Sequence, residues 1–318
     1  MVHIGYALSS EEHPANDLVT FARRAEEVGF EYAMISDHYH PWIDEQGEST
    51  FVWSVLGGIA RETTNLKVGT GVTCPTMRYH PAIIAQASAT VTEMMPGRFM
   101  LGVGTGEALN EHITGERWPA WEIRADMLEE AVEIIRDLWT GRAVSHYGEF
   151  FTVENARVYS LPDEPPPMIV AAGGPRAAEV AGRIGDGLIN YAPDHEVVAE
   201  FRASGGGDKP RFVQYTVCWA ADEAQARHTA RATVPTVALQ GEVTTLLPTP
   251  PHFEQATATV TEDQIAQVVV CGPDPARHID GIRKCVEAGF DHVHVDQVGP
   301  DQEGFFRFYE REILPKFR

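Results

Sequence analysis

A cluster of polar side chains at residues 36–42 contains the residue types that acid–base chemistry requires. It follows a short apolar run, 32–35, that is typical of a buried strand, and it includes Asp37, His38, His40 and Trp42. An imidazole is a natural general base because its unperturbed pKa lies near neutral pH. Asp37 could fix the tautomer of His38, or it could hydrogen-bond a ligand ring. The alternative is that His38 only caps or bonds a carbonyl of its own loop.

A glycine-rich segment before Glu107 could bring a ligand close to the backbone. Gly102, Gly104 and Gly106 alternate with other residues and lead directly into Glu107. Small residues at such positions permit close approach. The spacing is not that of the dinucleotide-binding fingerprint, and the segment is not expected to open a helix directly. An ordinary turn with a solvated Glu107 is the alternative.

A second glycine-rich segment resembles a phosphate cradle. Gly173 and Gly174 precede Pro175 and Arg176 at the expected start of a helix. Free N–H groups at a helix N-terminus favour anions, and Arg176 could add positive charge. A simple helix-entry turn is the alternative. The four cysteines lie far apart without metal-ligand spacing, which argues against a catalytic cysteine pair and against a metal site.

The elements that position these groups alternate between strand and helix patterns. Polar groups at the carboxyl ends of parallel strands meet at one rim of an α/β enzyme. The alternation predicts an α/β fold of the (β/α)8 TIM-barrel type, with an open doubly wound sheet as the alternative. One domain over 1–318 is expected, with insertions near 141–167 (after strand four) and 235–261 (after strand seven), and a helix near 262–270. The expected strands are 2–8, 31–37, 66–72, 99–102, 168–172, 188–191, 212–219 and 292–295.

Composition excludes several classes of partner. The net charge of -21 argues against nucleic acid and against anionic membranes, both of which would require a basic patch. No window approaches the length of about 18 apolar residues that a membrane helix requires. No signal-peptide pattern is seen at the N-terminus, and the scattered cysteines are typical of reduced thiols, so a cytoplasmic location is expected.

Several stretches together resemble the deazaflavin (F420)-dependent dehydrogenases of the bacterial-luciferase-like superfamily. They are residues 36–42, 69–76, 102–111, 171–175 and 185–187, and the similarity spans nearly the whole chain. The resemblance is to F420-dependent glucose-6-phosphate dehydrogenases and secondary alcohol dehydrogenases. It implies that coenzyme F420 is the cofactor, that a small alcohol or sugar is the substrate, and that the protein is a homodimer.

The resemblance also implies roles for individual residues. His38 would take the hydroxyl proton of the substrate while hydride moves to the deazaflavin. Trp42 would help hold the charge and the ring, and Glu107 would handle the proton at the cofactor's ring nitrogen. Gly71 and Val72 would form a non-prolyl cis peptide behind the cofactor ring. The other expected cofactor contacts are Asp37, Cys74, Thr105, Asn110, Gly173, Gly174, Arg176 and Ala177, and the expected substrate contacts are Glu11, His40 and Tyr191.

The chain departs from the sugar-phosphate dehydrogenases where two lysines would bind the substrate phosphate. Asp194 and, by a less certain alignment, Gln255 stand at those positions. We therefore expect an unphosphorylated alcohol or sugar as the substrate. An FMN-dependent monooxygenase of the same superfamily, a reductase that runs the reaction in reverse, and a non-catalytic ligand-binding barrel are the alternatives.

Overall fold

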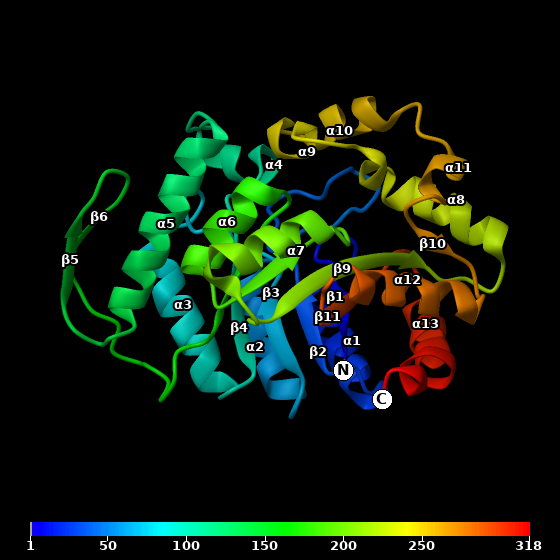
Figure 1. Ribbon diagram of the computed structural model, residues 1–318, viewed down its shortest axis with the longest axis horizontal. Helices are drawn as coiled ribbons and strands as arrows, with labels where there is room; N and C mark the ends of the chain where they lie inside the picture. Colours follow the sequence, from blue (N-terminus) through cyan, green and yellow to red (C-terminus); the bar gives the residue numbers. More distant parts are fainter. Residues whose placement is uncertain (1) are drawn as a thin grey trace.

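The chain folds around a closed barrel of parallel strands. The computed structural model describes residues 2–318 (Figure 1). Strands β1, β2, β3, β4, β7, β8, β9 and β11 pair in that order, and β11 pairs with β1 to close the ring. The predicted TIM barrel is confirmed, and the open sheet is wrong. The barrel strands are His3–Leu8, Tyr32–Ile35, Lys67–Thr70, Phe99–Val103, Met168–Ala171, Gly187–Asn190, Arg211–Cys218 and His292–Gln297.

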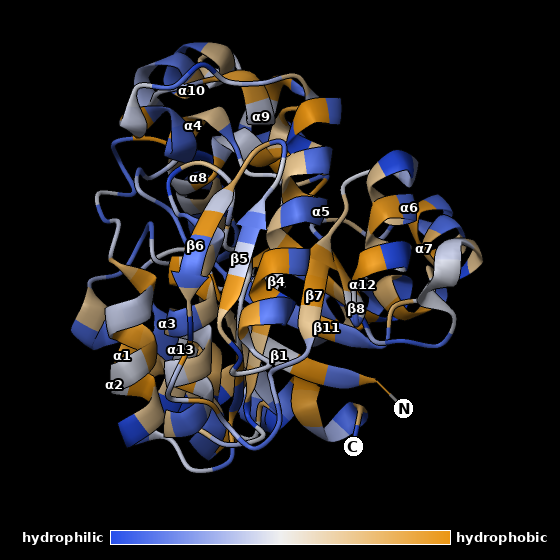
Figure 2. Cartoon of the chain, turned by 90° about the vertical axis from the view of Figure 1, so that its left-hand side faces the viewer, coloured by the Kyte–Doolittle hydropathy of each residue, from blue (hydrophilic) through white to orange (hydrophobic). Residues whose placement is uncertain are grey.

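Amphipathic helices cover the outside of the barrel. In α1, Leu18, Ala22 and Ala25 are buried at helical spacing, and Gly29 ends the helix with a left-handed φ of 100°. Strands such as β7 are coloured almost wholly as hydrophobic because both of their faces are covered (Figure 2). The covering helices are α1 (Ala15–Val28), α2 (Val52–Glu62), α3 (Pro81–Met94), α5 (Trp121–Leu138), α6 (Pro175–Ile184), α7 (His195–Phe201), α8 (Glu223–Thr233), α12 (Pro275–Glu287) and α13 (Gln302–Phe308).

Three local features differ from the sequence predictions. The helix expected over 262–270 is the short α11 (Glu262–Ile265), followed by β10 (Val270–Cys271), because Val270 and Cys271 pair with the edge of β9. The glycine-rich segment does lead into a helix, α4 (Ala108–Glu111), whose N-cap is Glu107. Helix α7 between β8 and β9 had no predicted counterpart.

Two segments extend beyond the alternating pattern. Between α5 and β7 the chain forms an antiparallel hairpin of β5 (Val144–Tyr147) and β6 (Thr152–Ala156). Between α8 and α11 it forms the short helices α9 (Val243–Leu246) and α10 (Pro250–Thr257), which lie on the same side of the barrel as α4 (Figure 1). The ring of Phe253 in α10 packs edge-on against Trp42 at 5.1 Å, so this segment contacts the polar loop after β2.

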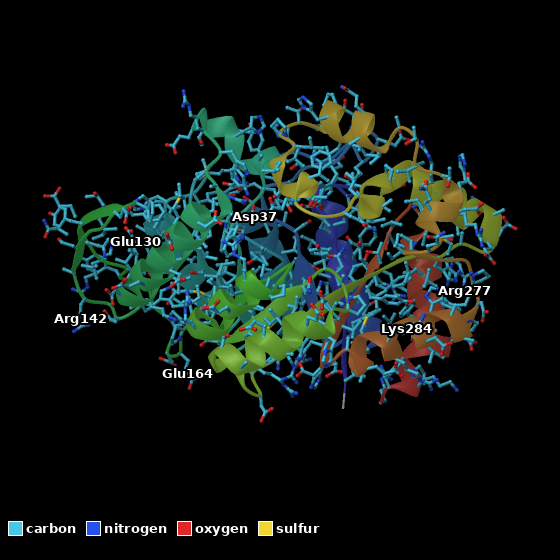
Figure 3. The ribbon with its side chains drawn as sticks, turned by 45° about the horizontal axis from the view of Figure 1, so that its top comes forward. Asp37, Glu130, Arg142, Glu164, Arg277 and Lys284 are labelled. Atoms are coloured by element: carbon cyan, nitrogen blue, oxygen red, sulfur yellow. The ribbon has the colours of Figure 1, made fainter. Side chains whose placement is uncertain are left out.

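A buried ion network ties together the loops that follow β2, β3 and β4. Arg78 Nη2 donates to the main-chain oxygen of Asp37 at 2.9 Å and to its Oδ1 at 3.1 Å, and the Arg78 N–H donates to Glu111 Oε2 at 2.8 Å. Thr73 Oγ1 donates to Asp37 Oδ2 at 2.7 Å. The side chains of Asp37 and Glu111 are each 1% exposed and that of Arg78 is 7% exposed. Asp37 lies in the interior of the molecule, whereas labelled residues such as Glu164 lie at its edge (Figure 3). We call this set the Arg78 network.

Replacing Arg78 with methionine is expected to destabilise the fold strongly. Two carboxylates would stay buried without their cation, which typically costs about 3–5 kcal/mol. Urea unfolding followed by circular dichroism measures this loss. The matched control is Arg136→Met, because the Arg136–Asp186 pair is 42% and 48% exposed and such pairs contribute at most about 1 kcal/mol. Equal losses in the two variants would contradict a special role for the network.

Candidate active site

The three side chains expected to act in catalysis come together at the barrel rim. His38, from the loop after β2, places Nε2 3.6 Å from Glu107 Oε2, which follows β4. Its Nδ1 is hydrogen-bonded to the main-chain oxygen of His40 at 3.2 Å, as the loop-carbonyl alternative expected, and it also lies 3.3 Å from Glu11 Oε1 in the loop after β1. The ring centroid of Trp42 is 5.1 Å from that of His38. Each ring nitrogen therefore faces a carboxylate oxygen, so the ring can exchange a proton on one side while it stays held on the other.

Two serines hold Glu11 beside His38. Ser36 Oγ donates to Glu11 Oε2 at 2.6 Å and Ser9 Oγ donates to the same oxygen at 3.1 Å. The side chain of Glu11 is 6% exposed, and Oε1 is the oxygen that faces the imidazole. A buried carboxylate bonded on one oxygen and directed at a ring with the other is suited to orient that ring.

Glu107 lies in surroundings that make its carboxyl group a proton donor as well as an acceptor. Its pKa is raised from 4.5 to about 7, chiefly by burial and also by the negative charges of Glu11 and Glu111, while His38 and Arg124 act in the opposite direction. A pKa near the working pH leaves both protonation states accessible, which is the condition for general acid–base catalysis.

Helix α4 fixes the loop that carries His38. Asn110 Oδ1 accepts hydrogen bonds from the backbone N–H groups of Tyr39, at 2.9 Å, and His40, at 3.2 Å, and its Nδ2 donates to Glu107 at 3.3 Å. His40 Nδ1 lies 2.9 Å from the Leu109 oxygen. His40 therefore packs against α4. The side chain of Asn110 links the loop after β2 to Glu107 after β4 through its hydrogen bonds.

An apolar shelf lies on the β3–β7 side of the same rim. The Gly71–Val72 peptide bond is cis, as expected. Val72 and Ala171 are half-buried and pack on the cluster that contains Met34 and Ile189 inside the barrel. A Cβ added at Gly104 would lie 2.8 Å from Val72 Cγ2 and 3.2 Å from Ala171 Cβ. The glycine therefore keeps the shelf flat, which fits a planar ring system.

Three further residues that were expected at the cofactor surround this shelf. Asp37 is the buried centre of the Arg78 network, where its two carboxylate oxygens already accept from Thr73 and Arg78. Cys74 is buried, with Sγ 3.0 Å from Thr76 Oγ1, and burial raises the pKa of its thiol. Thr105 is half-buried in the glycine-rich segment. Asp37 and Cys74 are therefore bonded within the protein at the back of the site.

The N-terminus of α6 provides a cradle beyond the shelf. A Cβ added at Gly174 would meet no atom within 4 Å, so the backbone there is open to a ligand. Tyr191 lies beside Gly173, with Cε1 2.9 Å from the position of a Cβ. The Arg176 guanidinium pairs with Glu122 at 2.5 Å and stacks on Trp121 at 4.4 Å. Ala177 is half-buried against the core. Open N–H groups at this helix end fit a phosphate.

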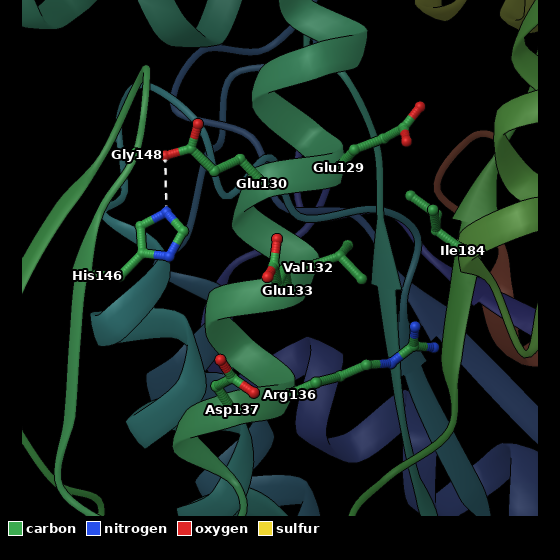
Figure 4. Close-up of a pocket in the computed structure, with 9 residues that line it drawn as sticks. All are labelled: Glu129, Glu130, Val132, Glu133, Arg136, Asp137, His146, Gly148 and Ile184. Atoms are coloured by element: carbon green, nitrogen blue, oxygen red, sulfur yellow. Dashed lines mark hydrogen bonds and ion pairs between the residues drawn. The ribbon is translucent and has the colours of Figure 1, made fainter.

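A groove away from the strand ends has a structural role. It has a volume of about 630 Å³ and lies along α5, with the β5–β6 hairpin on one side and the end of α6 on the other (Figure 4). Glu130 at its edge accepts from the N–H groups of Phe150 and Phe151, at 3.1 Å and 2.9 Å, and lies 3.1 Å from His146 Nε2. These bonds lower the pKa of Glu130 and anchor the hairpin. The groove is lined by Glu129, Glu130, Val132, Glu133, Arg136, Asp137, His146, Gly148 and Ile184.

Sequence reasoning missed several residues of the site. Ser36 belongs to the polar cluster at residues 36–42, but only the structure shows its hydrogen bond to Glu11. Glu111 follows Glu107 by four residues, a spacing that would place both carboxyl groups on the same face of a helix. Asp296 and Gln214 lie on the interior faces of β11 and β9, with Gln214 Nε2 donating to Asp296 Oδ2 at 2.9 Å.

Residues 2–318 contain neither a candidate metal site nor a candidate membrane span. No group of three or more His, Cys, Asp or Glu side chains in this range is arranged to hold a metal ion. None of the helices described for these residues has the length and apolar composition needed to cross a membrane.

Known proteins resemble this chain over its whole length. An F420-dependent glucose-6-phosphate dehydrogenase of Kribbella flavida is 36% identical over 330 residues, covering 100% of this chain and 98% of that protein. One of Amycolatopsis mediterranei is 34% identical, with 100% and 99% covered. The solved structure of an F420-dependent secondary alcohol dehydrogenase in complex with an F420–acetone adduct has a TM-score of 0.92 and 31% identity, with 100% and 99% covered.

More distant structures share the barrel. The coenzyme F420-dependent tetrahydromethanopterin reductase of Methanopyrus kandleri is 24% identical and has a TM-score of 0.82, with 100% of this chain and 99% of that chain covered. The sequence profile described as luciferase-like monooxygenase matches residues 1–292. With most of its length matched in this way, the chain belongs to the luciferase-like monooxygenase family.

Proposed function

We propose that this protein is an F420-dependent oxidoreductase that moves a hydride between the deazaflavin and a carbon carrying a hydroxyl group. The observation that carries the proposal is the position of His38 between two carboxylates, with Glu11 at 3.3 Å and Glu107 at 3.6 Å. This arrangement offers a base for an alcohol proton and a second acid–base group beside it. The F420-dependent relatives support the choice of cofactor.

The protein's own groups account for the movement of protons. An alcohol gives up a hydride more readily while its O–H proton is being removed, and His38 Nε2 accepts this proton. The main-chain oxygen of His40 and the carboxylate of Glu11 keep the imidazole oriented through Nδ1. Bound F420 supplies the hydride acceptor. Glu107, with a pKa of about 7, exchanges a proton at the cofactor's ring nitrogen, and Trp42 screens the reacting groups from water.

The proposed cofactor site consists of the shelf and the cradle. Gly71, Val72 and Ala171 would support the deazaflavin ring, because their flat apolar surface suits a planar ring. Gly173 and Gly174, at the open N-terminus of α6, would hold the phosphate. Ala177 and Arg176 flank it, and Arg176 would exchange its contact with the exposed Glu122 for the phosphate. Asp37, Cys74, Thr105 and Asn110 line the ring from behind.

The proposed substrate is an unphosphorylated secondary alcohol or sugar. Asp194 Oδ1 accepts from the N–H groups of Glu196, at 2.8 Å, and Val197, at 3.3 Å, and so caps α7. A carboxylate at this position repels a phosphate. Gln255 is exposed on α10 and carries no charge. His40 and Tyr191 would form the outer wall of the substrate pocket. The same groups serve ketone reduction by reduced deazaflavin, so the proposal covers both directions.

A luciferase-like FMN monooxygenase is the second candidate, because the family profile carries that description. It would use the same shelf and cradle, but it would not require His38 and Glu107 in these roles. We also propose a homodimer, as the resemblance implies, and a cytoplasmic location. All four cysteines are free and buried, which supports a reducing location. Sedimentation equilibrium measures the oligomeric state.

Loss of the oxidised deazaflavin's absorbance with a panel of alcohols and sugars tests the proposed activity. Free alcohols or sugars are expected to be oxidised with a higher kcat/KM than their phosphate esters. His38→Ala is expected to lower kcat/KM by roughly 10²–10⁴, the usual contribution of a general base. Tight binding of FMN with oxygen uptake would favour the second candidate. Unchanged turnover in His38→Ala would reject the proposed role of this residue.

The pH dependence of stability tests the state of Glu107 without any cofactor. Its folded pKa of about 7 exceeds the unfolded value of 4.5, so the folded state binds the extra proton between these values and loses stability as the pH rises through them. Above pH 7, Glu107→Gln is expected to be more stable than the unmodified protein by roughly 2 kcal/mol, a difference that should vanish below pH 4.5. The exposed Glu154, changed to Gln, is the control, and a pH-independent difference would contradict the assignment.

A further inference from the structure

One wall of the barrel interior is polar, which is unusual for a packed barrel core. On β11, His292, His294 and Asp296 alternate along the inward face, and His292 packs on Phe212 of β9 with ring centroids 4.3 Å apart. Gln214 and Thr216 continue the inward face of β9 toward the rim. Barrel interiors are normally filled by branched apolar side chains. We call Gln214, Thr216 and Asp296 the β9–β11 wall.

Hydrogen bonding in this wall is incomplete. Asp296 is 9% exposed, and its Oδ2 accepts from Gln214 Nε2 at 2.9 Å and from Thr216 Oγ1 at 3.2 Å. None of the described residues donates to its Oδ1. His294 on the same face is 3% exposed, and its Nδ1 also has no partner. Buried polar groups are almost always hydrogen-bonded, and His294 Nδ1 is a buried ring nitrogen without a partner. Asp296 Oδ1 is not fully buried, so it remains an accessible acceptor, and together the two groups point to a polar ligand.

The charge of the wall limits the kind of ligand. The pKa of Asp296 is raised to about 7, chiefly by burial and then by the negative charge of Glu11, while the hydrogen bonds from Thr216 and Gln214 act in the opposite direction. The charge that acts on Asp296 is thus that of another carboxyl group, Glu11. Two carboxyl groups close together disfavour a phosphate or carboxylate ligand. A hydroxyl group suits the wall, because it donates to a carboxylate oxygen and accepts from an amide.

The β9–β11 wall lies across the barrel mouth from the apolar shelf. Around the barrel, β9 and β11 are opposite β3 and β4, so the wall faces the Val72 shelf across the mouth. Glu11 links the two regions, since it contacts His38 at 3.3 Å and acts electrostatically on Asp296. Gln214 and Thr216 are half-buried rather than fully enclosed. A molecule held between the shelf and the wall would have one hydroxyl at His38 and another at Asp296.

We propose that Gln214, Thr216 and Asp296 form a hydroxyl-binding subsite, and that the substrate is a neutral polyol rather than a monohydric alcohol. This inference rests on the proposed function, because it places a second hydroxyl relative to the one that His38 deprotonates. The subsite discriminates by hydrogen bonding. A site built to bond a hydroxyl rejects an analogue without it, because the protein's buried polar groups are then left unpaired.

Matched substrates separate the subsite from the general activity. Cyclohexanol, the cyclohexane-1,2-, 1,3- and 1,4-diols and myo-inositol are compared with oxidised F420. At least one polyol is expected to exceed cyclohexanol in kcat/KM by about tenfold or more. Cyclohexanol matching or exceeding every polyol would overturn the inference while leaving the proposed function intact. Failure to oxidise any alcohol would reject the proposed function, and the binding measurement below would then decide on the subsite alone.

Two near-isosteric variants locate the discrimination. Asp296→Asn and Gln214→Leu are each expected to lower the ratio of polyol to cyclohexanol kcat/KM by about tenfold. Asp280→Asn, an Asp-to-Asn change at a side chain 68% exposed on α12, is the matched control and should keep the ratio. Thermal unfolding checks that each variant is folded. Ligand-observed NMR of myo-inositol with the cofactor-free protein gives the independent readout. Equal binding to the unmodified protein and to folded Asp296→Asn, or no binding to either, would overturn the subsite.

Discussion

Arg78 is the cation on which the arrangement of the rim depends. Its two carboxylate partners come from different loops, Asp37 after β2 and Glu111 after β4, and all three side chains are almost fully buried. Burying three charges is tolerated only while each keeps its partners, so the loops are constrained together. His38 is the neighbour of Asp37, and Glu111 follows Glu107 in the same short helix. The network thereby sets the separation of the imidazole and the carboxyl group that exchange protons.

Around this network the mouth of the barrel divides into two chemically different sides. The β3–β7 side is flat, glycine-rich and apolar, and it suits a planar ring. The side formed by β1, β9 and β11 carries Glu11 and Asp296, and it suits hydroxyl groups. His38 lies where the two sides meet. A hydride can pass between a ring on one side and a carbon on the other only if water is kept out, and Trp42 with Phe253 covers that junction.

The strand ends were readable from the sequence, because apolar runs followed by polar residues mark them. This pattern predicts that His38, Trp42 and Glu107 meet at one rim. The partners of Arg78 were not readable. Asp37 and Glu111 lie 41 and 33 residues from it, and local spacing carries no signal of such pairing. The last predicted strand, 292–295, stops one residue before Asp296. The alternation of His292 and His294 continues to Asp296 in the structure. Strand β10 escaped prediction because tertiary pairing overrode its helical pattern.

The contact of Phe253 with Trp42 joins two parts of the chain that are far apart in sequence. The proton-handling side chains all come from the first four strands and their loops, whereas α10 belongs to a peripheral segment of the second half. Evolution can therefore exchange the 243–257 segment, and with it the shape of the entrance, while the inherited proton chemistry is left untouched. Divergence within such a family would then proceed by remodelling one peripheral segment, and the same segment is the natural target for directed evolution of new substrate ranges.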